Sequence, residues 1–192
     1  MFYIAKINNE ISIGNIDLQA FQTQEGILVK RELEGRGIEF LLKKMFTDKE
    51  PELKYTEHNK PFLGSHNENI SISHSHEMLF IISNSKENTG VDVELIRDKI
   101  KNIKHKFLNK EELNFAGEDT EKLITLWAAK EAMYKAFGEK GIDFSKELRV
   151  YPFKNDELNF HGELNTKNSK KKYLLHRQKI RNYILVYTIS EV

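Results

Sequence analysis

The sequence contains no cysteine, which excludes disulfides, thiolate metal sites and a cysteine nucleophile. This absence is compatible with a reducing compartment. Long apolar runs are also missing, because the longest, 78–82 and 184–187, are too short to span a bilayer. The N-terminus lacks the basic, apolar and small-residue regions of a signal peptide. We therefore expect a cytoplasmic protein with no membrane partner.

A strong excess of charge of either sign is absent as well. The formal net charge is +1, so the whole chain is no electrostatic match for nucleic acid. The chain is 39% hydrophobic and 31% charged, a composition typical of a folded protein. Its 192 residues fit one large domain, or two small ones that share a core.

The most informative feature present is a pair of alternating carboxylates in Gly90-Val91-Asp92-Val93-Glu94. Successive side chains of a strand point to opposite faces. Asp92 and Glu94 therefore share one face, and the apolar side chains of 91, 93 and 95 can enter a core from the other. Joined by a third carboxylate from a helix, such a pair can bind a hard cation.

A helix that can supply the third carboxylate is predicted from Glu121 to Gly138. It is rich in alanine and has an apolar stripe, and Gly138 suits a C-terminal cap. Glu131 is the candidate third carboxylate. Lys135 follows four residues later, one turn along the same face, where it can tune the chemistry.

The N-terminal half alternates strands and a helix. Periodicity predicts strands at 2–7, 10–16, 53–55, 70–74, 78–83 and 90–95, and a helix at 23–46 that Gly35 and Gly37 weaken. The run 78–83 is continuously apolar, as expected for a strand buried on both faces. The last three strands are expected to form one antiparallel sheet.

The C-terminal half begins with a helix-prone polar stretch, 97–114. After the helix at 121–138, strands are predicted at 148–153, 158–164, 173–177 and 183–189. Both halves thus follow the order of a helix with basic residues, a polar connection and strands that end in an apolar one. This order favours two related α+β halves.

These segments resemble the paired signature of the 4′-phosphopantetheinyl transferases, Gly-Val-Asp-Val-Glu at 90–94 and Trp-Ala-Ala-Lys-Glu-Ala-Met-Tyr-Lys-Ala-Phe-Gly at 127–138. Three shorter segments match in the family's order. Residues 59–62 resemble its Gly-Lys-Pro segment, 72–75 its Ser-His-Ser segment, and 107–112 its Phe-Ser-x-x-Glu segment with Asn109 in place of serine. The similarity covers roughly residues 58 to 144, and weakly the helix near 30–44.

The resemblance implies a fold and an assembly state. The chain length is similar to that of the two-lobed, surfactin-type branch of the family. That branch implies two pseudo-symmetric α+β lobes, each a small antiparallel sheet packed on a long helix. The expected lobes are 1–88 and 89–192, the second with the metal site, and the active site lies at their interface. A monomer is favoured.

The resemblance also implies the chemistry. Family members move the phosphopantetheine arm of coenzyme A onto a serine of an acyl or peptidyl carrier protein, with Mg²⁺, and release 3′,5′-ADP. Asp92, Glu94 and Glu131 match the family's metal ligands. Glu131 is also the candidate general base, and Lys135 can keep it ionised and bind the phosphate.

The family's coenzyme A contacts map to further polar residues. Lys60, Ser73 and His74 match the adenine-nucleotide contacts, and Lys130 belongs to the helix motif. Basic residues around Arg31 and Arg36 are candidates for further phosphate contacts. Trp127 matches the motif too, and we expect it to pack the helix onto the sheet.

Each feature taken alone has a simpler structural interpretation. An Asp-x-Glu strand is common on solvent-facing edges, the Glu131–Lys135 pair occurs on ordinary amphipathic helices, and Glu112 can cap or bridge rather than bind metal. The five ordered matches favour the enzyme over two alternatives. One is a homologue that binds coenzyme A or a carrier protein without chemistry, and the other is an unrelated interaction or nucleic-acid-binding protein.

Overall fold

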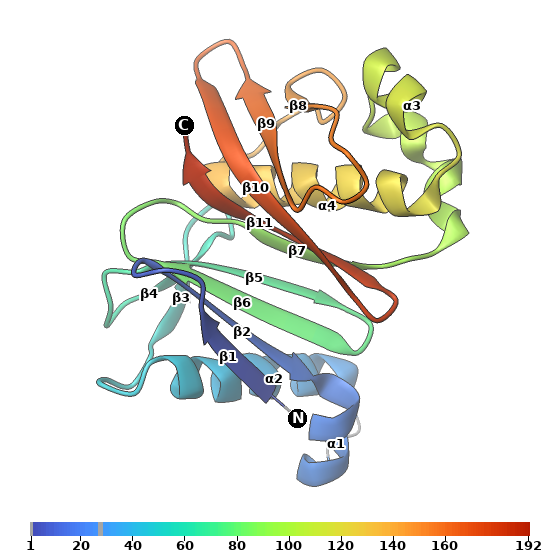
Figure 1. The fold of residues 1–192 in the computed structure, drawn as a ribbon. Coiled ribbons are helices and arrows are strands. Elements are labelled where there is room, and N and C mark those ends of the chain that lie inside the picture. Colours follow the sequence, from blue (N-terminus) through green and yellow to red (C-terminus); the bar gives the residue numbers. More distant parts are fainter. Residues whose placement is uncertain (1, 27–28) are drawn as a thin grey trace. The chain divides into compact units, whose positions relative to one another are not determined.

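The computed structural model describes residues 2–26 and 29–192, and the chain divides into two compact units, Met1–Asn88 and Thr89–Val192. Each unit contains an antiparallel sheet with a long helix on one face (Figure 1). The expected α+β class, with two antiparallel sheets and their helices, is confirmed. None of the helices in the described residues has both the length and the apolarity that crossing a membrane requires.

The sheet of the first unit has the strand order β1-β2-β6-β5-β4-β3, and all neighbours run antiparallel. Its strands are β1 (Phe2–Lys6), β2 (Ile11–Asp17), β3 (Leu53–Tyr55), β4 (Pro61–Leu63), β5 (Asn69–Ser75) and β6 (Met78–Asn84). Every residue of β6 is buried, as the apolar run predicts. The short strand β4 is not foreseen by the sequence pattern.

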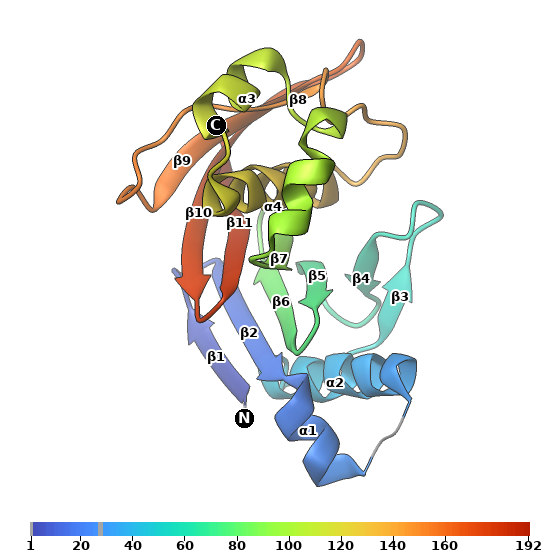
Figure 2. The same cartoon turned by 90° about the vertical axis from the view of Figure 1, so that its right-hand side faces the viewer.

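Two helices replace the single helix expected at 23–46, which is a correction (Figure 2). They are α1 (Leu18–Glu25) and α2 (Lys30–Met45). Gly26 ends α1 because it adopts the left-handed conformation, with φ 66°. Ile27, counted in the predicted apolar pattern, lies outside the described residues. Helix α2 runs through Gly37, where a Cβ atom would meet Leu18 Cδ2 at 2.9 Å.

The sheet of the second unit has the order β7-β11-β10-β9-β8 and is also antiparallel. Its strands are β7 (Val91–Leu95), β8 (Leu148–Val150), β9 (Asn159–Asn165), β10 (Lys170–Ile180) and β11 (Tyr183–Glu191). The expectation that β7 joins β5 and β6 is wrong, since β7 pairs with β11. A period-two pattern identifies a strand but does not encode its distant partner.

Helix α4 (Thr120–Phe137) packs across the second sheet, in contact with β7 and β11. Buried side chains of α4 and of the sheet form one core around Leu126 and Met133. The stretch 97–114 is not one helix. It forms two 3₁₀ turns, η1 (Asp98–Asn102) and η2 (Lys104–Lys106), followed by α3 (Lys110–Ala116).

Candidate active site

Two carboxylates of β7 stand on the sheet face that α4 covers. In the ladder between β7 and β11, Asp92 lies opposite Val186, and Glu94 lies opposite Ile184. Both partners belong to the core on which α4 packs. The alternating valines of β7 are buried and point to the other face. The predicted division of this strand into a carboxylate face and a valine face is confirmed.

Helix α4 passes close to Gly90, the residue before β7. A Cβ atom at this position would lie 1.8 Å from the carbonyl oxygen of Ala132, a distance that no side chain tolerates. The helix is also fixed at both ends. The Asp119 carboxylate accepts hydrogen bonds from two N–H groups of the first turn, and Gly138 caps the C-terminus with φ 78°. These contacts set the distance between the carboxylates of β7 and the polar side chains of α4.

Two side chains of α4 hold the carboxylates of β7. The ammonium of Lys135 lies 2.7 Å from Oδ1 of Asp92 and donates a second hydrogen bond to the carbonyl of Val91 at 3.0 Å. The indole N–H of Trp127 donates to Oε1 of Glu94 at 2.9 Å. Trp127 therefore orients a carboxylate in addition to the packing role expected of it.

Glu131 occupies the turn of α4 between Trp127 and Lys135. Burial, the nearby negative charge of Asp92 and, less strongly, that of Glu94 together raise its pKa to about 7, against the opposing effect of Lys135. The three carboxyl groups thus lie within electrostatic range of one another and of a single ammonium. A carboxyl group that titrates near neutrality can accept and return a proton, as a general base must.

The three carboxylates fit a divalent cation by their chemistry. Mg²⁺ prefers oxygen ligands, and the charge repulsion that Glu131 experiences is what a cation would relieve. Within residues 2–26 and 29–192, however, no three ligand side chains are assembled as a metal site. Lys135 and Trp127 hold one oxygen each of Asp92 and Glu94 in this conformation. Metal binding by this set stays a prediction.

Comparison with known families gives a decisive match. A family model described as the 4′-phosphopantetheinyl transferase superfamily matches residues 88–188, more than half of the chain. The chain belongs to the 4′-phosphopantetheinyl transferase superfamily. The matched range contains both β7 and α4. The superfamily implies phosphopantetheinyl transfer, with coenzyme A and a carrier protein as partners. A search of curated proteins finds no match.

Three predicted nucleotide contacts of this superfamily member lie in the first unit, outside the matched range. The ammonium of Lys60 lies 2.8 Å from Oδ1 of Asn88. On β5, Ser73 is buried and His74 is exposed, because neighbouring side chains alternate. Nδ1 of His74 lies 3.5 Å from Oε1 of Glu34 on α2. The roles of Lys60, Ser73 and His74 in binding stay predictions.

Two further predicted phosphate contacts lie on α2. Arg31 and Arg36 are both exposed, and Arg36 pairs with Glu32 one turn away, at 2.8 Å. Their spacing along the helix places the two arginines on different faces, so the structure does not bring them together. A contact of either arginine with phosphate stays a prediction.

Lys130 does not fit the role expected of it. Its side chain is fully buried, and its ammonium lies 2.7 Å from Oε2 of Glu112 and 2.8 Å from each of three backbone oxygens, those of Phe107, Phe144 and Leu148. An ammonium has three protons, so these acceptors use all of them. We correct the expected coenzyme A contact of Lys130, because burial leaves no atom of this side chain for a ligand. Glu112 caps the N-terminus of α3 and pairs with Lys130, in agreement with the simpler structural interpretation of this residue.

A cavity of about 610 Å³ beside Glu131 was missed at the sequence level. Its aromatic lining consists of Phe107, Trp127, Tyr134 and Phe144. Much of the wall comes from 103–107, inside the stretch expected to be helix-prone, and from the loop 141–144, for which the sequence pattern gives no prediction. The aromatic residues at the ends of these two segments were the available signal.

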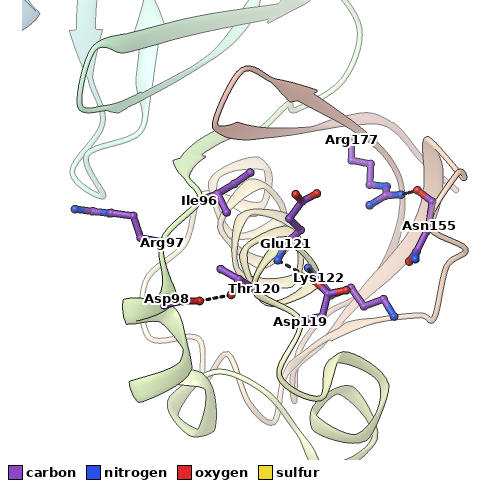
Figure 3. A pocket seen from close by; sticks show the side chains of 9 residues that line it. All are labelled: Ile96, Arg97, Asp98, Asp119, Thr120, Glu121, Lys122, Asn155 and Arg177. Atoms are coloured by element: carbon purple, nitrogen blue, oxygen red, sulfur yellow. Dashed lines mark hydrogen bonds between the residues drawn. The ribbon is translucent and has the colours of Figure 1, made fainter.

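Figure 3 shows a second pocket, of about 550 Å³, where α4 begins. Three of its charged residues, Asp98, Asp119 and Arg177, are hydrogen-bonded within the protein itself. The Thr120 hydroxyl donates to Asp98, Asp119 caps the helix, and the guanidinium of Arg177 donates to the backbone oxygen of Asn155. No predicted site residue lines this pocket, and we assign it no function.

Proposed function

We propose that this protein transfers the 4′-phosphopantetheine arm of coenzyme A to a serine hydroxyl of an acyl or peptidyl carrier protein and releases 3′,5′-ADP. The observation that carries the proposal is the coupled set of Asp92, Glu94, Glu131 and Lys135, inside the range that matches the superfamily. The presence of two α+β units supports the two-lobed, surfactin-type branch.

The chemical step needs a base and charge neutralisation. The serine oxygen forms a bond to the phosphorus that bears the pantetheine arm, and the bond from this phosphorus to the oxygen bridging to the nucleotide breaks. The departing 3′,5′-ADP retains that oxygen. Glu131 accepts the serine proton, directly or through a water molecule, because its raised pKa suits proton transfer near neutrality. Lys135 offers its positive charge to the phosphate.

Asp92, Glu94 and Glu131 would hold the Mg²⁺ ion. When bound, the ion supplies Lewis-acid stabilisation of the diphosphate charge. Trp127 keeps Glu94 oriented through its indole N–H. Lys60, Ser73 and His74 are proposed for the adenine nucleotide, and exposed basic side chains of α2, Arg31 and Arg36, for its phosphates.

The proposal is tested by incubating the protein with coenzyme A, MgCl₂ and a panel of fatty-acid, polyketide and peptide carrier proteins. Intact-mass spectrometry should show one added arm on at least one carrier. Asp92→Asn and Glu131→Gln should slow this transfer by about 10²-fold or more while they retain the wild-type circular dichroism spectrum.

The matched control is Glu139→Gln, an exposed carboxylate just beyond the end of α4, which should transfer at the wild-type rate. If Asp92→Asn and Glu131→Gln both transfer the arm as fast as this control, the roles assigned to Asp92 and Glu131 are wrong. Coenzyme A binding in a calorimeter, with no carrier modified by the wild type, would instead identify the non-catalytic homologue.

A further inference from the structure

The cavity beside Glu131 is lined by three separate parts of the second unit. These are the end of the 3₁₀ region at 103–107, the helix α4 and the loop at 141–144. Aromatic rings join these parts. The centroid of the Trp127 ring lies 4.9 Å from that of Phe107 and 5.7 Å from that of Phe144. Two of the three parts are short, a 3₁₀ turn and a loop, and their internal hydrogen bonds do not fix their distance from α4.

One buried ammonium binds both short segments. Lys130 Nζ donates to the backbone oxygens of Phe107 and Phe144, each at 2.8 Å, and both residues line the cavity. A third bond, also 2.8 Å, reaches the oxygen of Leu148 at the start of β8. Lys130 precedes Glu131 on α4, so the same helical turn presents the carboxyl group to the cavity and fixes the walls around it.

The carboxylate partner of Lys130 is tied just as closely. Oε2 of Glu112 lies 2.7 Å from Lys130 Nζ and accepts from the N–H of Asn109 at 2.9 Å, and Oε1 accepts from the N–H of Val150 at 2.8 Å. A buried ion pair is poor evidence for stability, because well-packed apolar residues often replace it without loss. Its directional bonds do fix the segments that it joins.

We propose that Lys130 and Glu112 are positioning residues that set the spacing of the cavity walls beside Glu131. They touch neither substrate, and they act through Phe107, Phe144 and the ring of Trp127 that lies against both. This inference rests on the proposed function for its kinetic consequence only. Its structural consequence, the ordering of the Trp127 surroundings, can be measured without any substrate.

The test uses the double variant Lys130→Met with Glu112→Gln. Removing both charges together avoids the buried, unpaired ion that is left, at a large cost in stability, when only one partner is deleted. The control is Lys122→Met, a lysine of the same helix away from the cavity. Circular dichroism and thermal unfolding establish that the double variant is folded. Folded single variants provide the same test should the double variant not fold.

The first readout is the fluorescence of Trp127, which is the only tryptophan of the chain. In the double variant we expect red-shifted emission and at least about twofold stronger quenching by acrylamide, because the walls no longer enclose the ring. The control should keep wild-type emission. Unchanged emission and quenching in the folded double variant would overturn the proposal, whether or not any carrier protein is ever modified.

The second readout is steady-state kinetics with both substrates varied in turn. We expect KM for coenzyme A or for the carrier to rise at least about fivefold, since a misplaced wall impairs binding. A purely structural role would lower the amount of active enzyme, and so the apparent kcat, and leave both KM values at the wild-type level. That outcome would overturn the proposal. An inactive wild type would instead refute the proposed function and leave the fluorescence test to decide on the positioning pair.

Discussion

At the scale of single residues, one ammonium group compensates a cluster of acidic side chains. Lys135 pairs with Asp92 at 2.7 Å and also lowers the pKa of Glu131, which Asp92 and Glu94 raise. The lysine therefore supplies part of the charge neutralisation that a divalent cation would provide. A cation bound by these carboxylates would compete with this ammonium for the negative charge of Asp92.

This competition predicts an unusual effect of Lys135→Met. Without coenzyme A, the variant should bind Mg²⁺ about tenfold more tightly than the wild type, because the carboxylates lose their internal counter-ion, a difference of about 1.4 kcal/mol. Phosphopantetheinyl transfer should nevertheless slow, since the charge offered to the phosphate is gone. Titration calorimetry with MgCl₂ measures the first effect. Weaker or equal Mg²⁺ binding by Lys135→Met would show that the ammonium does not compete.

The raised pKa of Glu131 predicts that the unfolding free energy of the protein depends on pH. Its pKa is about 7 in the folded protein against 4.5 in the unfolded chain, so ionisation costs folding free energy. The penalty is absent below pH 4.5, grows as the pH rises and is complete above pH 7. In EDTA, the unfolding free energy of Glu131→Gln relative to the wild type should therefore rise with pH. The total rise from pH 4.5 to above pH 7 should be about 2–3 kcal/mol.

Urea unfolding of both proteins at pH 4.5 and pH 8 measures this difference. Because Lys135 lowers the pKa of Glu131, the gain should be larger when both proteins carry Lys135→Met. A difference in unfolding free energy that stays constant with pH would mean that folding does not raise the pKa of Glu131.

At the scale of elements, the site depends on how closely α4 lies on β7. Gly90 is the contact point, and Gly90→Ala would place a methyl group 1.8 Å from the Ala132 carbonyl oxygen. We expect this variant to lose about 2 kcal/mol or more of unfolding free energy, because the strand and helix must separate.

Gly35 supplies the contrasting case. It lies exposed within α2, and among the described residues no atom outside the nearby helix backbone lies within 4 Å of a Cβ atom built there. Gly35→Ala should stabilise the protein by about 0.5–1 kcal/mol, since alanine is the better helix former. Thermal or urea unfolding compares the two variants. Equal effects would contradict the close packing of α4 on β7 at Gly90.

Elements with strong local signals were predictable from the sequence, and their distant partners were not. Helix α4 has its apolar pattern, and Gly138 marks its end, as the structure confirms. The division of β7 into two faces also follows from local alternation. Its pairing with β11 does not, because period two encodes no partner. The break after α1 lies at Gly26, where a left-handed cap outweighed a continuing helical pattern.

At the scale of the whole molecule, the sequence motifs predicted the type of reaction more readily than the positions of the side chains in the fold. Asp92, Glu94, Glu131 and Lys135 could be proposed together because their residue types match one reaction. Lys130 belongs to the same motif, yet its environment gives it a different role. Its burial depends on Glu112 and on three backbone oxygens that no local pattern reveals.

In the proposed reaction, the acidic cluster of β7 and α4 drives transfer of the arm from coenzyme A to a carrier serine. The most direct measurement follows 3′,5′-ADP release by chromatography and carrier mass in the same reaction. We predict equal amounts of nucleotide and modified carrier with MgCl₂, and neither product with EDTA or in Asp92→Asn. Nucleotide released without a matching gain in carrier mass, or full transfer by Asp92→Asn, would contradict the claim.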